Sequence, residues 1–291
     1  MAHSGSLLGE RDGLRVIDCE QCSIAHLDPL PDAVALVDYY RDSFWQNEKA
    51  GALEQIEAQW HWLKEIYGDW LGLVGRHTLG RTLLDVGCGY GQFMLEAQTL
   101  GWQTRGIELS HRAVAYAKAH GAKIHQAGWP LDWPDTWPAR FDAITALWLI
   151  EHLPEPLVFL RWCSQSLYGG GVLLVAVPND FSTIQAEVNK HVKVPWYWLH
   201  HTHLNYFDWA SSANLLGRAG FRIVERQTQF PMEKFLVAGF DYTDNPSLGA
   251  DCHRSVEAVD LGMTRADRIA HYAEMAQQGR GRELICVCVK E

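Results

Sequence analysis

Residues 83–97 read LLDVGCGYGQFMLEA. An apolar run ends at Asp85, and the turn after it has the pattern G-x-G-x-G, formed by Gly87, Gly89 and Gly91. Glycines suit such a turn because the backbone bends sharply and a ligand has to approach it without meeting a Cβ atom. The N–H groups at the start of the following helical pattern are then free to bind that ligand. The stretch predicts a strand, a binding turn and a helix of a doubly wound α/β fold.

Short apolar runs alternate with amphipathic segments from about residue 81 onward, as in a parallel sheet flanked by helices. The predicted strands cover residues 82–86, 104–109, 123–127, 141–148, 171–178, 221–228 and 283–290. The predicted helices between them cover residues 91–100, 110–120, 155–167 and 208–220. The fold class is therefore α/β, with a mostly parallel seven-stranded sheet.

The pattern divides the chain into three parts. Residues 1–31 hold a short strand, a Cys-x-x-Cys turn and a proline-rich exit, after a first dozen residues that look disordered. Residues 32–75 are predicted to form a helical cap, and residues 76–291 the core. Insertions at 179–207 and 230–281 interrupt this core, and the second is too long for a tight connection, so it should be helical.

The composition excludes several classes of protein. A formal net charge of -10 would repel a phosphate backbone. No apolar run is long enough to cross a bilayer, and the first residues lack the pattern of a signal peptide. The seven scattered cysteines fit a reducing compartment. We expect a cytoplasmic protein with a small-molecule substrate that binds neither nucleic acid nor membranes; its oligomeric state stays open, a homodimer being one option.

Two carboxylates distinguish the ligand of the glycine turn from a dinucleotide. Asp85 directly precedes the turn, where it can take an ammonium group but would repel a pyrophosphate. The turn also lacks the third glycine spaced for a pyrophosphate-binding helix. Glu108 ends the next predicted strand, where a carboxylate can accept the hydroxyls of a ribose. This combination favours S-adenosylmethionine as the cofactor.

Several segments resemble class I S-adenosylmethionine-dependent methyltransferases. LLDVGCGYG followed by GIELS (106–110) resembles their first two cofactor motifs, FDAITALWLIEHLPEP (141–156) their fourth strand and the loop after it, and LYGGGVLLVAVPN (167–179) their fifth strand. The resemblance covers roughly residues 80–228 and implies a methyltransferase with the fold predicted above. The residues that it places at the cofactor are Asp85, Gly87, Cys88, Gly89, Gly91, Glu108, Leu109, Gly128, Trp129, Leu147 and Leu149. The resemblance implies that Asp85, Gly87 and Gly89 hold the amino-acid end and that Glu108 holds the ribose. It places Leu109, Gly128 and Trp129 near the adenine and Leu147 and Leu149 next to the methyl group, and Cys88 is a small spacer.

The segment HHTHLNYFDWASSANLLGRAGFRIVE (200–225) resembles a subgroup of ubiquinone-type, sugar and natural-product methyltransferases, which carry an H-L-N-x-F pattern. Ubiquinone-type members can carry a glutamate three residues before their Glu-His pair, which helps to bind a divalent metal. Trp148 stands at that position here. This departure from the ubiquinone-type pattern argues against an active-site metal and against a quinone precursor as the acceptor.

Histidines are the candidate general bases, because a hydroxyl acceptor has to lose a proton to attack. His203 of the H-L-N-x-F pattern is the first choice, followed by His152 in the loop after the fourth strand and His200. Each can instead steady its own loop. The acceptor pocket is expected beneath residues 32–72, 181–206 and 230–281. Its predicted aromatic lining is Tyr39, Tyr40, Trp60, Phe181, Trp196, Trp198 and Tyr206.

The favoured function is methyl transfer to a hydroxyl group of a sugar or secondary metabolite. N- or C-methylation of a small molecule stays open, because the sequence does not encode the acceptor atom. A nicotinamide-dependent oxidoreductase is disfavoured by Asp85 and by the Glu-His-Leu loop, and a non-catalytic cofactor-binding protein by the intact motif.

Cys19, Cys22 and His26 form a further pattern, which resembles half of a small zinc ribbon found in front of some relatives. Four ligands are normal for structural zinc, and no second Cys-x-x-Cys follows nearby. The sequence therefore favours a degenerate remnant and leaves metal binding open.

Overall fold

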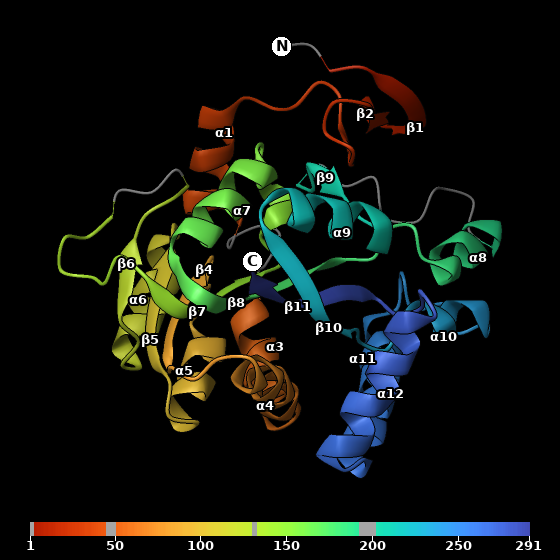
Figure 1. Cartoon of the computed structure of the whole chain (residues 1–291). Coiled ribbons are helices and arrows are strands. Elements are labelled where there is room, and N and C mark those ends of the chain that lie inside the picture. Colours follow the sequence, from red (N-terminus) through yellow and green to blue (C-terminus); the bar gives the residue numbers. More distant parts are fainter. Residues whose placement is uncertain (1–2, 45–50, 130–132, 192–201) are drawn as a thin grey trace.

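The computed structural model describes residues 3–44, 51–129, 133–191 and 202–291 (Figure 1). Its central sheet has seven strands in the order β10-β11-β8-β7-β4-β5-β6. Strand β11 is antiparallel to both of its neighbours, β10 and β8. The remaining pairings, β8–β7, β7–β4, β4–β5 and β5–β6, are parallel. This confirms the predicted fold. The strands are β4 (Thr82–Val86), β5 (Gln103–Glu108), β6 (Ile124–Gln126), β7 (Phe141–Leu147), β8 (Leu167–Pro178), β10 (Phe221–Gln227) and β11 (Glu283–Lys290).

Helices cover both faces of this sheet, because successive strand residues point to opposite sides and both sets are apolar. Leu84 faces a cluster built with Phe159 and Leu216, whereas its neighbour Leu83 faces a second cluster that contains Trp70. The helices between the strands are α5 (Gln92–Thr99), α6 (His111–Ala119), α7 (Pro156–Gln165) and α9 (Trp209–Arg218), and α4 (Trp60–Arg76) precedes them. The core thus consists of one buried sheet between two helical layers.

The segments outside this core are also structured. Before α4 lie α1 (Ala33–Asp38), the π-helix η1 (Tyr39–Ser43) and α3 (Ala52–Ala58). The first insertion contains α8 (Thr183–His191) and the short strand β9 (Asn205–Tyr206). The second contains α10 (Glu233–Val237), α11 (Pro246–Gly262) and α12 (Arg265–Gln277). No helix among the described residues has the length and apolar character that a membrane span requires.

The N-terminal part forms a second sheet, and here the expectation of a disordered start was wrong. Strand β1 (Gly5–Arg11) pairs with β2 (Leu14–Cys19) in an antiparallel hairpin, and β3 (Ala25–Leu27) and β9 complete the order β1-β2-β3-β9. The hairpin turn is Asp12-Gly13, with φ values of 51° and 80°. An Asp-Gly pair is a strong signal for such a two-residue turn. Cross-strand pairing through this turn orders residues whose polar character had suggested disorder.

A buried ion pair ties α12 to α4 and can be tested by mutation. The Arg268 guanidinium donates two hydrogen bonds to the Asp69 carboxylate, of 2.6 and 3.0 Å, and both side chains are buried. Arg265, which is half exposed, also donates to Asp69. We expect Arg268→Ala to lower the free energy of unfolding by about 1.5–3 kcal/mol, because it leaves a buried carboxylate with one partner fewer.

The matched control is Arg265→Ala, which removes a solvent-screened partner and should cost at most about 1 kcal/mol. Urea denaturation of both variants measures the difference. Equal losses in the two variants would contradict this account of the contact between α4 and α12.

Candidate cofactor and acceptor site

A cavity of about 1080 Å³ lies at the carboxyl ends of the parallel strands β4, β5 and β7. Ligands of open α/β sheets bind at this edge, and the volume is sufficient for a cofactor together with a small acceptor. The cavity is lined by most of the residues predicted for the cofactor, and by part of the predicted acceptor site. Those that line it are Asp85, Gly87, Cys88, Gly89, Glu108, Leu109, Gly128, Trp129, Leu147, Leu149, Tyr40, His152 and His203.

The glycine turn adopts the geometry that its sequence predicts. Gly87, Gly89 and Gly91 all have positive φ, of 73°, 53° and 83°. A Cβ atom on Gly87 would lie 3.0 Å from a methyl carbon of Leu149, so a side chain would crowd the cavity. Gly91 is the N-cap of α5 and packs toward Ala117 of α6. It is not among the residues that line the cavity and serves the turn by setting the start of the helix.

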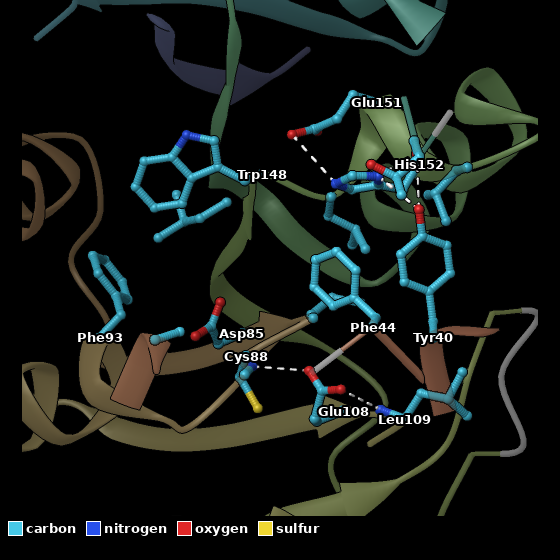
Figure 2. Close-up of a pocket in the computed structure, with 18 of the residues that line it drawn as sticks. Tyr40, Phe44, Asp85, Cys88, Phe93, Glu108, Leu109, Trp148, Glu151 and His152 are labelled. Atoms are coloured by element: carbon cyan, nitrogen blue, oxygen red, sulfur yellow. Dashed lines mark hydrogen bonds and ion pairs between the residues drawn. The ribbon is translucent and has the colours of Figure 1, made fainter. Parts of the chain in front are cut away.

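Glu108 is held by backbone donors at the end of β5 (Figure 2). One carboxylate oxygen accepts a hydrogen bond of 2.9 Å from the N–H of Gly89. The other accepts from the N–H groups of Leu109 and Ser110, at 2.9 and 2.8 Å. Each carboxylate oxygen can accept more than one hydrogen bond, so we expect Glu108 to accept from a ribose hydroxyl as well. The carboxylate also fixes the position of the glycine turn relative to β5.

Asp85 is buried at the end of β4, next to the turn (Figure 2). The hydroxyl of Thr145 on β7 donates to it over 2.6 Å. The pKa of Asp85 is raised to about 7, mainly by burial; the Thr145 hydrogen bond lowers it and the charge of Glu108 raises it. Burial also raises the pKa of the neighbouring Cys88 thiol well above its usual value, which fits a spacer and not a nucleophile.

The raised pKa of Asp85 predicts a pH-dependent affinity for the cofactor. The ammonium group of S-adenosylhomocysteine binds the ionised carboxylate, of which only about a tenth is present at pH 6 if the pKa is about 7. We therefore expect the dissociation constant to be about eightfold higher at pH 6 than at pH 7.5. Calorimetric titrations across this range measure it.

The Asp85→Asn variant is the control, because it cannot ionise and reports only the titration of the ligand. If the dissociation constant depended on pH in the same way in both proteins, the assignment of Asp85 to the ammonium group would be contradicted. The stability of the ligand-free protein should change in the opposite sense. The folded state holds the Asp85 proton more tightly than the unfolded state, so stability is lost as the pH rises from about 4 toward about 7.

The acceptor end of the cavity contains a tyrosine and a histidine that share one carbonyl oxygen (Figure 2). The Tyr40 hydroxyl donates to the carbonyl of Thr202 over 2.8 Å, and Nδ1 of His152 lies 2.7 Å from the same oxygen. A carbonyl only accepts, so Nδ1 of His152 carries the proton and Nε2 keeps the lone pair. This Nε2 lies 3.8 Å from the carboxylate of Glu151, which is buried. The arrangement orients His152 as a proton acceptor.

The H-L-N pattern holds the loop that carries these groups. The Asn205 amide is buried and donates to the carbonyls of Ile150 and Leu153, at 3.0 and 2.7 Å. The N–H of Leu204 donates to the carbonyl of Glu151 over 2.7 Å. His203 lines the cavity, and its ring centre lies 5.0 Å from that of His152. The anchoring role of Asn205 was not predicted, although the pattern that contains it was noticed.

The cavity wall also includes aromatic residues that the sequence analysis did not assign to it. Phe44, Tyr67, Phe93 and Trp148 line it from η1's end, α4, α5 and the end of β7. Trp148 has a φ of 50°, a conformation that costs energy for a bulky residue and that recurs at functional sites. Helical periodicity marks Tyr67 and Phe93 as partly buried, but it cannot show which of them reaches a cavity.

Other predicted residues lie elsewhere. Tyr206 is fully buried in the N-terminal sheet, Phe181 is largely exposed, and Tyr39 and Trp60 lie near the cavity but do not line it. His200, Trp196 and Trp198 fall outside the described residues.

The second insertion does not cover the cavity as expected. Among the described residues that line it, none comes from 230–281. Helix α12 packs on β10 and α11 on α4. Both helices lie at the lower right of Figure 1. The helices before α4 do cover it, as expected for residues 32–72, because α1, η1 and α3 contribute Leu36, Tyr40 and Ile56 to the wall.

This fold, with a carboxylate on each side of a glycine turn at the sheet edge, defines a class I S-adenosylmethionine-dependent methyltransferase. The sequence model of the methyltransferase domain family matches residues 59–226, more than half of the chain. The chain therefore belongs to this family.

Curated relatives are similar over part of their length. A ubiquinone biosynthesis O-methyltransferase of Idiomarina loihiensis is 30% identical over 120 residues, which are 38% of this chain and 48% of the relative. One from an Azoarcus species is 30% identical over 128 residues, 41% of this chain and 53% of the relative. The chain thus spans about half the length of the curated relatives it matches.

A solved structure shares the fold over most of the chain. The magnesium protoporphyrin IX methyltransferase of Synechocystis PCC 6803, with bound S-adenosylhomocysteine, superposes with a TM-score of 0.54 at 12% identity. It covers 89% of this chain and 100% of its own.

Proposed function

We propose that this protein transfers the methyl group of S-adenosylmethionine to a hydroxyl group of a small, partly apolar acceptor. The observation that carries the proposal is the continuity of one cavity, which contains the cofactor carboxylates Asp85 and Glu108 together with the pair Tyr40 and His152. Its wall is mainly apolar and includes several aromatic side chains, which suits a sugar ring or a secondary metabolite with apolar faces.

The sulfonium cofactor is already a strong electrophile, so the protein has to align the acceptor, exclude water and remove a proton. We propose that Nε2 of His152 accepts the proton of the acceptor hydroxyl, the role for which the sequence favoured His203. Nδ1 of His152 is fixed by the Thr202 carbonyl, and Glu151 lies where it can stabilise the imidazolium that forms. His203 then positions the acceptor or the His152 ring.

The proposal is tested by screening hydroxyl-bearing sugars and secondary metabolites with labelled S-adenosylmethionine, followed by mass spectrometry and NMR of the product. An O-methylated product supports it, and a methyl group on nitrogen or carbon would support the alternative acceptor atoms instead. Tight cofactor binding without turnover of any acceptor would favour a non-catalytic cofactor-binding protein.

The reaction is predicted to need no metal ion. A divalent ion is the alternative to a proton-accepting His152, because the ligand atoms of Glu151, His152 and His203 lie within 4.8 Å of one another. Trp148, however, stands where the metal-binding relatives have a further carboxylate. We expect added Mg²⁺ to leave kcat unchanged, both in the untreated enzyme and after EDTA. Loss of turnover that Mg²⁺ restores would replace the proton-acceptor role of His152 by metal coordination.

A further inference from the structure

A second cluster of metal-ligating side chains lies in the N-terminal sheet, outside the cofactor cavity. It consists of His3, Cys19, Cys22 and His26, whose ligand atoms all lie within 4.8 Å of one another. Nδ1 of His3 is 2.9 Å from Nε2 of His26, and it is 3.5 and 3.3 Å from the sulfur atoms of Cys19 and Cys22. The cluster supplies the fourth ligand whose apparent absence had suggested a degenerate remnant.

The separations match a tetrahedral zinc site. Zinc–sulfur bonds of about 2.3 Å and zinc–nitrogen bonds of about 2.0–2.1 Å place N and S ligands about 3.5 Å apart and two N ligands about 3.3 Å apart. The observed N–S distances are 3.3 and 3.5 Å, and the N–N distance is 2.9 Å. A shift of less than about half an ångström at the two histidines would bring these three separations to zinc geometry, and the other ligand atoms lie within 4.8 Å of one another.

The surroundings orient the ligands. Nδ1 of the buried His26 donates to its neighbour's carbonyl at Leu27 over 2.7 Å, so the lone pair of Nε2 faces the cluster. The N–H of Cys22 donates to the sulfur of Cys19 over 3.4 Å and so helps to hold that sulfur in place. Ser23, with a φ of 60°, closes the Cys-x-x-Cys turn through its N–H to the Cys19 carbonyl. The turn thus presents both sulfur atoms on one side.

The β1–β2 hairpin explains why the spacing of residues in the sequence did not reveal these four side chains as one set of ligands. His3 lies 16 residues before Cys19 (19 minus 3), and it reaches the cysteines because the β1–β2 register places Gly5 opposite Cys19. A ligand contributed by strand pairing leaves no short motif in the sequence.

We propose that His3, Cys19, Cys22 and His26 bind one structural zinc ion. Two thiolates and two imidazoles in tetrahedral array select Zn²⁺, and four protein ligands leave no open position for catalysis. The ion connects the first strand to the β2–β3 turn. Strand β3 pairs with β9, where His26 lies opposite Asn205, the residue that anchors the Glu-His loop. The zinc site therefore supports the acceptor side of the cavity and does not touch the cofactor.

The test is the metal content of the untagged full-length protein, purified without chelators and measured by inductively coupled plasma mass spectrometry. We expect about one zinc per chain, and Co²⁺ in its place should give the intense visible bands of a tetrahedral thiolate site. His3→Ala and Cys22→Ser should each lose most of the zinc. The matched controls His77→Ala and Cys252→Ala, which lie outside the cluster, should keep it.

Calorimetry with S-adenosylhomocysteine shows whether each variant is folded. If a variant does not fold, chelation of the wild-type protein replaces it, and the melting temperature should then fall and recover with Zn²⁺. Wild-type protein that holds no zinc and gives no tetrahedral Co²⁺ spectrum would overturn the proposal. So would full zinc content in His3→Ala, or a Cys19–Cys22 disulfide detected as the loss of two hydrogens by mass spectrometry.

Discussion

The His152→Ala variant is expected to lose roughly 10²–10⁴-fold in kcat while it binds S-adenosylhomocysteine as the wild type does. The reason is the geometry at the acceptor end of the cavity, where a carbonyl fixes Nδ1 of His152 and Nε2 lies 3.8 Å from the Glu151 carboxylate. The cofactor residues Asp85 and Glu108 are separate from it and should be unaffected. Steady-state kinetics with the acceptor found by the screen, together with calorimetry, measure both quantities.

His203→Ala is the matched comparison, because His203 lines the same cavity with its ring beside that of His152. A positioning role for His203 predicts a higher KM for the acceptor with a smaller change in kcat. Added imidazole should partly restore kcat in His152→Ala. If His203→Ala carries the large loss in kcat, and imidazole restores that variant instead, the base is His203, as the sequence pattern suggested.

The second large effect is expected for Glu108→Ala, which should weaken S-adenosylhomocysteine binding by more than about 100-fold. The variant removes a charged acceptor for the ribose and also the partner that holds the Gly89 N–H in place. Hydrogen bonds to charged groups contribute about 1.5–3 kcal/mol each, so losing two amounts to roughly 3 kcal/mol or more. Calorimetry provides the dissociation constants.

Glu108→Gln is the conservative control for this effect. Its single amide oxygen can still accept from the donors on one side, either Gly89 or Leu109 and Ser110, so the loss of affinity should be smaller than in Glu108→Ala. Asp85→Ala should also weaken binding, through the ammonium group. Wild-type affinity in both alanine variants would remove the basis for placing the cofactor at this turn.

The sequence alone determined the central sheet and the cofactor end of the site. Strands buried on both faces read as continuous apolar runs, so β4, β5, β7 and β11 could be placed within a residue or so. Asp85 and the glycine turn are contiguous in the chain, and Glu108 ends the next strand, β5. Neighbouring parallel strands end at the same edge of a sheet, which is why Asp85 and Glu108 could be assigned to one cavity.

The tertiary structure decided what depends on contacts between distant segments. The acceptor wall combines η1, α4 and the end of β7, and aromatic residues give no sign in the sequence of whether they face a cavity or a core. Tyr206, which was predicted for the pocket, is fully buried in the N-terminal sheet. The tertiary structure also decided the position of His3, because strand pairing brings it to Cys19. Periodicity indicates which side of an element is buried, but only packing decides what lies against it.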